Sequence, residues 1–369
     1  MSEENKNRKI ILAGGGTGGH IFPAVAIANA LKKMEPGIEI LFVGAKGKME
    51  MEKVPESGFR ITGIDIAGYN RSSLIKNIGV PFKLIKSFFQ VRKIVNSFRP
   101  DALIGVGGYS SFPVLRYAQS QGKSTFIHES NAFAGKSNIW LGKRAIKIFV
   151  AGEGMEKFFK EEKIVITGNP VRANIVNNSI SHEEGIRFFG LDPDKRTVLV
   201  TGGSLGAKGI NEAIAAGIEE FEKNDIQLIW QTGRTFAEKA KQICLGKKNI
   251  WTAEFITKME YAFAAADSVV SRAGSMSITE LCVAKKPVVF VPFPFAAEDH
   301  QTGNALRLVN KNAALMVRDT EAKEKLVRTV IELVMDEQRR NELKENIGRL
   351  AVTNADEIIA SEILKAIHG

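Results

Sequence analysis

The sequence is poor in cysteine and in the aromatic residues that stack on nucleic-acid bases. Its two cysteines, Cys244 and Cys282, have no spacing typical of a metal site, and two thiols cannot build a disulfide framework. We therefore expect a protein of a reducing compartment. Three tryptophans and four tyrosines also fall short of the aromatic-rich pattern of nucleic-acid-binding surfaces, so we predict no nucleic-acid partner.

Long apolar runs are absent as well. No run of about 18 uninterrupted apolar residues occurs, so the sequence predicts no membrane-spanning helix. The polar start MSEENKNRK is not typical of a secretory signal peptide. Hydrophobic residues make up 44% and charged residues 25% of the 369 positions, which is a globular composition, and this length favours two domains over one.

Positive charge is concentrated in one part of the chain. Between Ala67 and Gly152 there are 13 lysines and arginines but only two acids, Asp101 and Glu129. The local net charge of +11 exceeds the +10 of the whole chain. A field of this kind attracts nucleic acid, an anionic membrane surface or an acidic substrate.

Apolar runs of strand length alternate with helix-length segments throughout. The pattern predicts an α/β protein with two successive units, each built on a parallel sheet. The expected strands are 10–13, 38–43, 102–106, 124–128 and 146–150 in the first unit, and 197–201, 227–231, 249–252, 268–271 and 287–291 in the second. A boundary is expected near GNPVR (168–172), and the apolar residues of 358–367 predict a closing amphipathic helix.

A glycine turn follows the first expected strand. Gly14, Gly16 and Gly19 fit the pattern G-x-G-x-x-G between a strand and a helix, so backbone N–H groups there are expected to face a phosphate or diphosphate. A nicotinamide dinucleotide site is an alternative. Such sites place an acid after the second strand, but here that strand ends at Val43 and continues as Gly-Ala-Lys.

A second glycine turn, GGSLGAKG (202–209), follows the first strand of the second unit and suits the same role. Its first five residues also fit the G-x-S-x-G nucleophile elbow of serine hydrolases, with Asp267 and His300 available as partners in the right chain order. This alternative leaves the first glycine turn without a use.

Three further motifs need an interpretation. The segment GVGGYSSFP (105–113) is either a third donor loop or a structural turn. Asp192 and Asp194 precede a strand, so they are expected to form a turn rather than a metal site. The triplet GKS at 135–137 resembles the end of a P-loop, but Ser130 stands where the earlier glycine is required.

With these motifs placed, the chain resembles the MurG family of bacterial glycosyltransferases along nearly its whole length. Seven ordered motifs are far more specific than one. They are GGGTGGHIFP (14–23), GVGGYSSFP (105–113), IHESNAFAG (127–135), TGNPVR (167–172), GGSLGAKGIN (202–211), SRAGSMSITE (271–280) and FAAEDHQTGNA (295–305).

The resemblance implies a GT-B fold, in which two Rossmann-like domains with parallel sheets face each other across a cleft and the C-terminal helix returns to the N-terminal domain. It assigns residues 1–170 and 353–369 to an acceptor-binding, membrane-associating domain and residues 171–352 to the domain that binds UDP-N-acetylglucosamine (UDP-GlcNAc). No cofactor and no metal are implied.

The implied reaction is an inverting transfer of N-acetylglucosamine from UDP-GlcNAc to the muramyl 4-hydroxyl of lipid I, an undecaprenyl-diphosphate-linked muramyl pentapeptide. The product is lipid II for peptidoglycan synthesis, and with it for cell-wall growth and division. The resemblance also implies a peripheral location on the anionic cytoplasmic face of the inner membrane and protein partners from the cell-wall machinery.

Carried over residue by residue, the family's donor contacts fall in both domains. Ser204 would hold the diphosphate, Glu280 would accept from the ribose hydroxyls and Ile256 would present backbone groups to uracil. The full set is Thr17, Gly18, Gly19, Asn131, Arg172, Ser204, Ile256, Ser275, Met276, Ser277, Ile278, Thr279, Glu280 and Gln301.

Inversion requires a base for the acceptor hydroxyl and stabilisation of the departing UDP. His20 is the predicted base, because the positive end of a helix keeps its imidazole neutral, and Glu129 is the second candidate. Arg172 would stabilise the diphosphate. The segment LIKNIGVPFKLIKSFF (74–89) is predicted to rest on anionic lipid, with an ordinary amphipathic helix facing the core as the alternative.

Other functions remain open at this point. A UDP-GlcNAc epimerase of the same fold is the nearest, followed by an NAD(P) oxidoreductase and a serine hydrolase, and a basic nucleic-acid-binding module is the non-enzyme alternative. Protection against heat by UDP but not by NADH or an oligonucleotide would separate most of them, and transfer to a lipid I analogue would decide against the epimerase.

Overall fold

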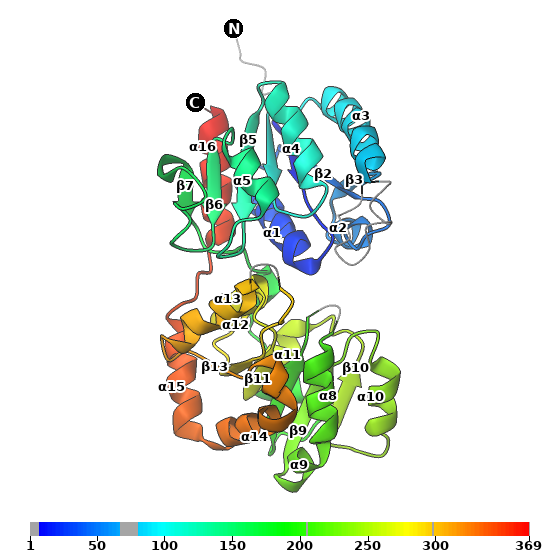
Figure 1. Ribbon diagram of the computed structural model, residues 1–369, viewed down its shortest axis with the longest axis vertical. Helices are drawn as coiled ribbons and strands as arrows, with labels where there is room; N and C mark the ends of the chain where they lie inside the picture. The colour runs from blue at the N-terminus through cyan, green and yellow to red at the C-terminus, as the bar shows by residue number, and fades with distance from the viewer. Residues whose placement is uncertain (1–6, 67–79, 204–205, 297–298, 369) are drawn as a thin grey trace. The chain divides into compact units, whose positions relative to one another are not determined.

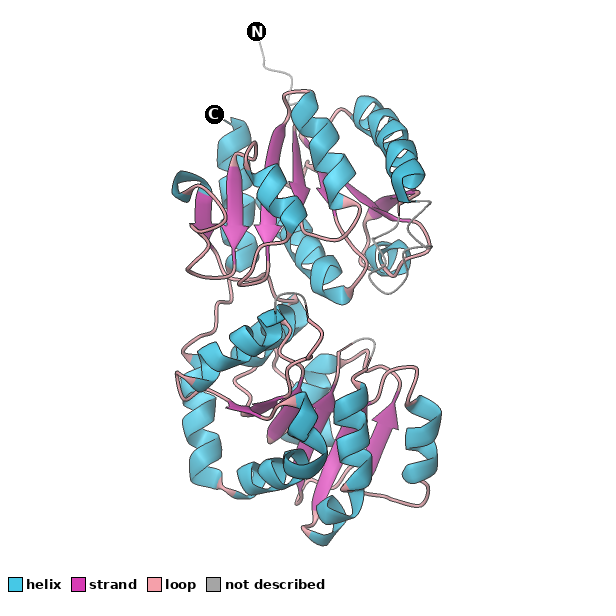
Figure 2. Ribbon diagram, viewed as in Figure 1, coloured by secondary structure: helices cyan, strands magenta, loops and turns pink. Residues whose placement is uncertain are grey.

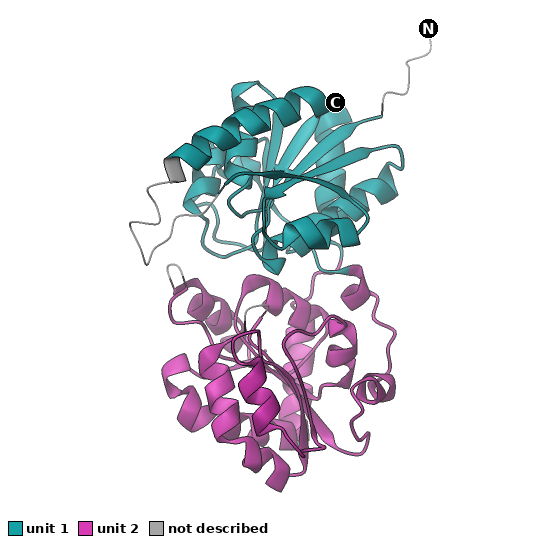
Figure 3. Cartoon of the chain, turned by 90° about the vertical axis from the view of Figure 1, so that its right-hand side faces the viewer, with its two compact units in different colours: residues 1–172, 354–369 teal, residues 173–353 magenta. Residues whose placement is uncertain are grey.

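The computed structural model describes residues 7–66, 80–203, 206–296 and 299–368 of the chain. The polypeptide forms two compact units (Figure 3). Unit 1 comprises residues 1–172 and 354–369, and unit 2 comprises residues 173–353. The chain therefore leaves unit 1 once and returns to it at its end.

Unit 1 is built on a seven-stranded sheet in which the strand pairs are parallel. The order β3-β2-β1-β4-β5-β6-β7 is that of a doubly wound α/β sheet. The strands are β1 (Lys9–Ala13), β2 (Glu39–Ala45), β3 (Arg60–Ile64), β4 (Ala102–Gly105), β5 (Ser124–Glu129), β6 (Lys147–Val150) and β7 (Ile164–Ile166).

Helices cover both faces of this sheet (Figures 1 and 2). Alternation along β1 sends Ile10 and Leu12 to one face and Ile11 and Ala13 to the other, and helices cover both faces, which is why β1 is apolar from Ile10 to Ala13. The first face is covered by α1 (Gly18–Met34), α2 (Glu50–Glu56) and α16 (Ala355–His368), and the second by α3 (Val80–Phe98), α4 (Ser111–Ser120) and α5 (Lys136–Gly142).

The last helix, α16, completes unit 1 by packing along α1. Ile359 and Ile363 are fully buried there in the same apolar cluster as the inner side of α1. The Arg8 guanidinium donates to the Ile367 carbonyl at 2.8 Å and ties this helix to the start of β1. The predicted return of the C-terminal helix to the first domain is confirmed.

Unit 2 repeats the same plan with six parallel strands in the order β10-β9-β8-β11-β12-β13. These are β8 (Arg196–Thr201), β9 (Ile226–Gln231), β10 (Ile250–Ala253), β11 (Ser268–Ser271), β12 (Val288–Phe290) and β13 (Leu315–Met316). Its helices are α6 (Ala173–Val176), α7 (His182–Phe188), α8 (Lys208–Ala216), α9 (Ile218–Lys223), α10 (Ala237–Ile243), α11 (Met259–Ala265), α12 (Ser275–Val283), α13 (His300–Val309), α14 (Ala322–Met335) and α15 (Glu337–Gly348). The predicted α/β class with two parallel sheets is confirmed.

Three edge strands were not predicted. β3, β7 and β13 each pair with one neighbour and are short or partly exposed, so they lack the apolar run of a central strand. Ile166 at the end of β7, for example, is 56% exposed. Among the described residues, no helix combines the length and the apolar character needed to cross a membrane.

Candidate active site

Each sheet changes its direction of winding beside its first strand. β1 has β2 on one side and β4 on the other, and β8 lies in the same way between β9 and β11. Doubly wound sheets bind ligands at this point, beyond the carboxyl ends of the strands. The candidate site in each unit is therefore formed by the loops after these two strands, and the glycine turns are the first of them.

The first three amides of the unit 1 glycine turn are already bonded within the protein. Gly14 N–H donates to a carbonyl of β2 at 3.2 Å, and Gly15 N–H donates to the Gly107 carbonyl at 3.3 Å. Gly16 N–H donates to the carboxylate of Glu50 at 2.7 Å. These three amides are engaged within unit 1, so the amides that the G-x-G-x-x-G pattern offers to a phosphate are those at the start of α1, which follow them.

The loop after β4 packs against this turn. A Cβ at Gly108 would lie 2.3 Å from the Gly15 carbonyl oxygen, and the φ of +84° at Gly108 also favours glycine. The Ser111 hydroxyl donates to the Ala13 and Gly107 carbonyls at 2.7 and 2.8 Å. Of the two interpretations of GVGGYSSFP, these contacts favour the structural turn.

His20 lies in the first turn of α1, because this helix begins at Gly18. Its ring rests on Gly107, where a Cβ would lie 2.5 Å from Nδ1, and this nitrogen is buried. Burial lowers the pKa of His20, while Glu129, a backbone carbonyl and Glu50 oppose that shift. The ring is therefore neutral at pH 7 and able to accept a proton.

The carboxylate of Glu129 is occupied by hydrogen bonds from the loop that follows β5 and from the first turn of α5. Oε1 accepts from the N–H and the side-chain amide of Asn131 at 3.1 and 3.3 Å. Oε2 accepts from Gly135 N–H at 3.0 Å and from the side-chain amide of Asn138 at 2.8 Å. A carboxylate has about four acceptor positions, and all are used here. Glu129 organises its loop, and the geometry favours His20 over Glu129 as the base.

We expect Glu129→Gln to lower the free energy of unfolding by roughly 2–3 kcal/mol, because an NH₂ group would then face the existing N–H donors. Urea unfolding measures this effect, with the exposed Glu153→Gln of the same unit as the matched control. A Glu129→Gln variant that is as stable as the unchanged protein but has no turnover would instead make Glu129 the base.

His128, the residue before Glu129, was missed by sequence reasoning. It is 1% exposed, and both of its ring nitrogens are buried. Burial lowers the pKa of His128 to about 4, and the neighbouring His20 acts in the same direction, whereas Asn169 opposes it. A histidine in a central, buried strand was the signal that could have found it. In the described part of the chain, no three or more His, Cys, Asp or Glu side chains gather as a metal site.

Arg172 ends the first segment of unit 1 and lies over the ring of Phe22, with its guanidinium carbon 4.7 Å from the ring centroid. The Phe22 ring in turn lies against Gly18, where a Cβ would be 3.0 Å away. The arginine charge is thus held beside the start of α1, which Thr17 precedes as N-cap and Gly18 and Gly19 open. Most of the unit 1 donor contacts predicted from the family gather at this helix terminus.

In unit 2, Gln231 connects the second glycine turn to the segment after β10. Its Nε2 donates to the Gly203 carbonyl at 2.9 Å and to the Thr201 hydroxyl at 3.2 Å, and its Oε1 accepts from Ile256 N–H at 2.9 Å. The Ile256 N–H is therefore used within unit 2, so the predicted backbone contact to uracil would have to use the carbonyl. Gln231 was not predicted, and Ser204 lies outside the described residues.

The remaining predicted donor contacts lie on two helices that pack together, α12 and α13. α12 begins after Gly274 at the carboxyl end of β11, and its first two turns carry Ser275, Met276, Ser277, Ile278, Thr279 and Glu280. Gln301 is in the first turn of α13, where its Oε1 accepts from Phe293 N–H at 3.0 Å and its Nε2 can donate to a ligand.

The acid proposed for a serine-hydrolase triad is at the wrong edge of the sheet. Asp267 precedes β11, accepts from Thr197 N–H at 2.8 Å and pairs with Arg196 at 3.3 Å. These residues lie at the amino ends of β8 and β11, whereas His300 follows β12 at the carboxyl end. Asp267 therefore cannot orient His300, and the triad is not assembled.

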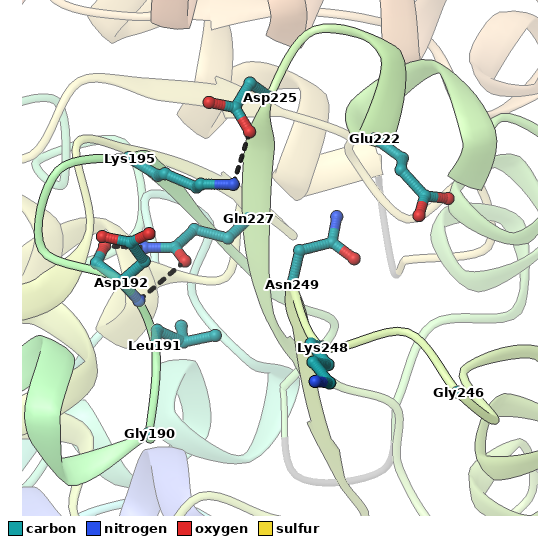
Figure 4. A pocket seen from close by; sticks show the side chains of 10 residues that line it. All are labelled: Gly190, Leu191, Asp192, Lys195, Glu222, Asp225, Gln227, Gly246, Lys248 and Asn249. Atoms are coloured by element: carbon teal, nitrogen blue, oxygen red, sulfur yellow. Dashed lines mark hydrogen bonds and ion pairs between the residues drawn. The ribbon is translucent and has the colours of Figure 1, made fainter.

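The acidic pair before β8 forms a turn, as predicted. Asp194 N–H donates to the Asp192 carboxylate at 3.0 Å, and Lys195 N–H donates to the Asp192 carbonyl at 3.3 Å. The turn borders a cavity of about 580 Å³ at the amino edge of the unit 2 sheet (Figure 4). There Lys195 pairs with Asp225 at 2.6 Å and Gln227 binds the turn, so these groups serve each other rather than a ligand.

Comparison with known proteins agrees with this arrangement. The Glycosyltransferase family 28 N-terminal domain matches residues 10–150, and the family 28 C-terminal domain matches residues 197–359. Among solved structures, MurG of Acinetobacter baumannii superimposes with a TM-score of 0.75 at 28% identity, covering 97% of this chain and 99% of that one.

Two curated relatives decide the family. Enzymes of Phocaeicola vulgatus and Parabacteroides distasonis are 49% and 50% identical over 363 and 361 residues, covering 98% and 97% of this chain and 96% and 98% of theirs. Both are named UDP-N-acetylglucosamine–N-acetylmuramyl-(pentapeptide) pyrophosphoryl-undecaprenol N-acetylglucosamine transferase. The chain belongs to the MurG family. As a MurG-family protein it is a glycosyltransferase. A putative UDP-N-acetylglucosamine 2-epimerase of Listeria monocytogenes, with a TM-score of 0.69 at 17% identity, shares the fold alone.

Proposed function

We propose that this chain transfers N-acetylglucosamine from UDP-GlcNAc to lipid I, forming lipid II with inversion at the anomeric carbon. The observation that carries the proposal is the identity of about one half, over nearly the full length, to two enzymes named for this transfer. The geometry supports it, because each unit presents its own loops at the switch point of its sheet.

The proposed chemistry divides between the two units. In unit 1, neutral His20 takes the proton of the muramyl 4-hydroxyl as its oxygen attacks the anomeric carbon. The bond from that carbon to the diphosphate oxygen breaks, and UDP leaves with the electron pair. Arg172 and the amides of the second glycine turn stabilise the negative charge, and Glu280 and Ile256 hold the ribose and the uracil.

The decisive experiment supplies labelled UDP-GlcNAc with and without a lipid I analogue. Transfer of label to the analogue, with UDP released in equal amount, is the expected result. Conversion of UDP-GlcNAc to its 2-epimer in the absence of acceptor, with no transfer in its presence, would replace the proposal by the epimerase.

We also propose that unit 1 meets an anionic membrane through α3. Phe82, Ile85 and Phe89 are 74%, 57% and 68% exposed, at spacings that place them on one side of the helix. Exposed Lys83 follows Phe82 and lies at the edge of this side, about 100° around the helix axis from Phe82. The opposite side of α3 enters the core through Val91, so the ordinary amphipathic interpretation does not account for the exposed aromatic side. Residues 67–79, including Lys76, lie outside the described residues.

We propose that this surface holds the chain peripherally on the cytoplasmic face of the inner membrane, where the proposed lipid-linked acceptor would be anchored. Lys86 contributes less charge there than its position suggests, because it pairs with Asp65 at 3.0 Å. That lysine, with Gln90 and Lys46, lowers the pKa of Asp65 to about 2.

We expect Lys83→Gln to weaken binding to anionic vesicles about fivefold, since one lysine near such a surface contributes about 1 kcal/mol. Sedimentation with vesicles of phosphatidylglycerol and phosphatidylethanolamine at 0.1 M salt measures the change. Lys160→Gln, an exposed lysine elsewhere in unit 1, is the control. Equal binding by both variants would remove α3 from the membrane contact.

A further inference from the structure

Glu50 is a buried acid that neither the motifs nor the reaction accounts for. It opens α2 and is 1% exposed. Its Oε2 accepts from Gly16 N–H at 2.7 Å, and its Oε1 accepts from Ala45 N–H at 2.9 Å. One carboxylate thus connects the last residue of β2 to the glycine turn that follows β1, and these two strands are neighbours in the sheet.

The chain is shaped to admit this carboxylate. A Cβ at Gly15 would lie 2.2 Å from the Glu50 carboxyl carbon, and a Cβ at Gly44 would lie 2.5 Å from its Cγ. Both positions therefore require glycine. The φ of +88° at Gly16 directs the amide of that residue to the carboxylate in a conformation that glycine adopts readily.

A glycine turn at a helix start usually offers its amides to a bound anion. In unit 1 the anion is a side chain of the same unit, and it is held by the turn that leads directly into the helix carrying His20. An internal anion fixes the turn before any ligand arrives, whereas a ligand anion would fix it only on binding.

We propose that Glu50 is a positioning residue for the transfer reaction, which holds the first glycine turn in the shape that presents His20 to the acceptor. This inference rests on the proposed function. Glu50 touches no reacting atom. It acts through the backbone of Gly16 and through the charge that it places near the imidazole.

The negative charge of Glu50 changes the pKa of His20 in a defined direction. The groups that face His20 are Glu129 and His128 from β5, Glu50 from α2 and a carbonyl of the loop after β4. Both carboxylates raise the pKa of His20 against the effect of burial. Removal of the Glu50 charge therefore lowers that pKa, which shifts the acid limb of the rate profile to lower pH and weakens the base.

The test compares Glu50→Gln with Glu52→Gln, an exposed glutamate on the same helix. We expect Glu50→Gln to lower kcat at least tenfold, to change binding of UDP, whose proposed uracil and ribose contacts lie in unit 2, less than twofold, and to move the acid limb to lower pH. Glu50→Asp keeps the charge and should retain an intermediate kcat with the original acid limb. It also provides a folded variant if the glutamine variant is unstable.

Chemical rescue separates positioning from a loss of structure. Glu50→Ala leaves a space for one small carboxylate, so acetate should restore part of kcat where chloride at equal ionic strength does not. A folded Glu50→Gln with the kcat and pH profile of Glu52→Gln, or Glu50→Ala without rescue, would overturn the inference. Absence of transfer by the unchanged protein would instead overturn the proposed function.

Discussion

Replacement of His20 by alanine is expected to lower kcat by about 10²- to 10⁴-fold, the usual contribution of a positioned general base. Binding of UDP should stay unchanged, because the ring lies in unit 1 against Gly107, whereas the proposed uracil and ribose contacts belong to unit 2. Initial rates with a lipid I analogue and calorimetric titration with UDP measure the two effects separately.

His182→Ala is the matched control, because His182 is exposed on α7 in unit 2. Normal turnover in His20→Ala would remove His20 as the base. The pH profile adds a second check. The pKa of His20 lies below its ordinary value of 6.5, so the ring stays neutral and kcat should hold its plateau as the pH falls past 6.5. It should decline only at lower pH, and a midpoint above 6.5 would contradict the assignment.

Glu280→Ala is expected to weaken UDP binding by about 10- to 100-fold, since a hydrogen bond to a charged group contributes about 1.5–3 kcal/mol. Glu280 lies in the second turn of α12, at the carboxyl edge of the unit 2 sheet. Its carboxylate can accept from both ribose hydroxyls, so KM for the donor should rise while kcat at saturation changes little.

A ligand lacking one hydroxyl makes this prediction specific. In the unchanged protein 2′-deoxy-UDP should bind more weakly than UDP, and in Glu280→Ala the two should bind alike. Glu238→Ala, on the exposed side of α10, is the control for removal of an acid. Unchanged UDP affinity in Glu280→Ala, or a preserved difference between the two ligands, would take Glu280 out of the ribose site.

The fold followed from the sequence wherever a strand is buried on both faces. β1 and β4 are apolar along nearly their whole length, so their positions could be predicted to within a residue or two. Edge strands such as β7 have a weaker sequence pattern. Each pairs with a neighbour on one side only, and its residues are partly exposed, so they need not be apolar. Their hydrogen bonds depend on a neighbour distant in sequence, which local periodicity does not encode.

The site was predictable in its location and less so in its contacts. Glycine turns after first strands indicated both switch points. The partners of those turns could not be deduced, because Glu50 reaches Gly16 across 34 positions and Gln231 reaches Ile256 across 25. Glu129 shows the same limit, since four hydrogen bonds from a loop and the helix after it decide whether the carboxylate acts as a base or only holds the loop in place.

The position of α16 has a consequence for how the protein is made. This helix is synthesised after the whole of unit 2, yet it buries the apolar side of α1, the helix that carries His20. On the ribosome, unit 2 can fold as a continuous segment while unit 1 still has an uncovered apolar surface. The nascent chain therefore leaves this apolar surface uncovered until α16 emerges, and unit 1 is completed last although its first residues are translated first.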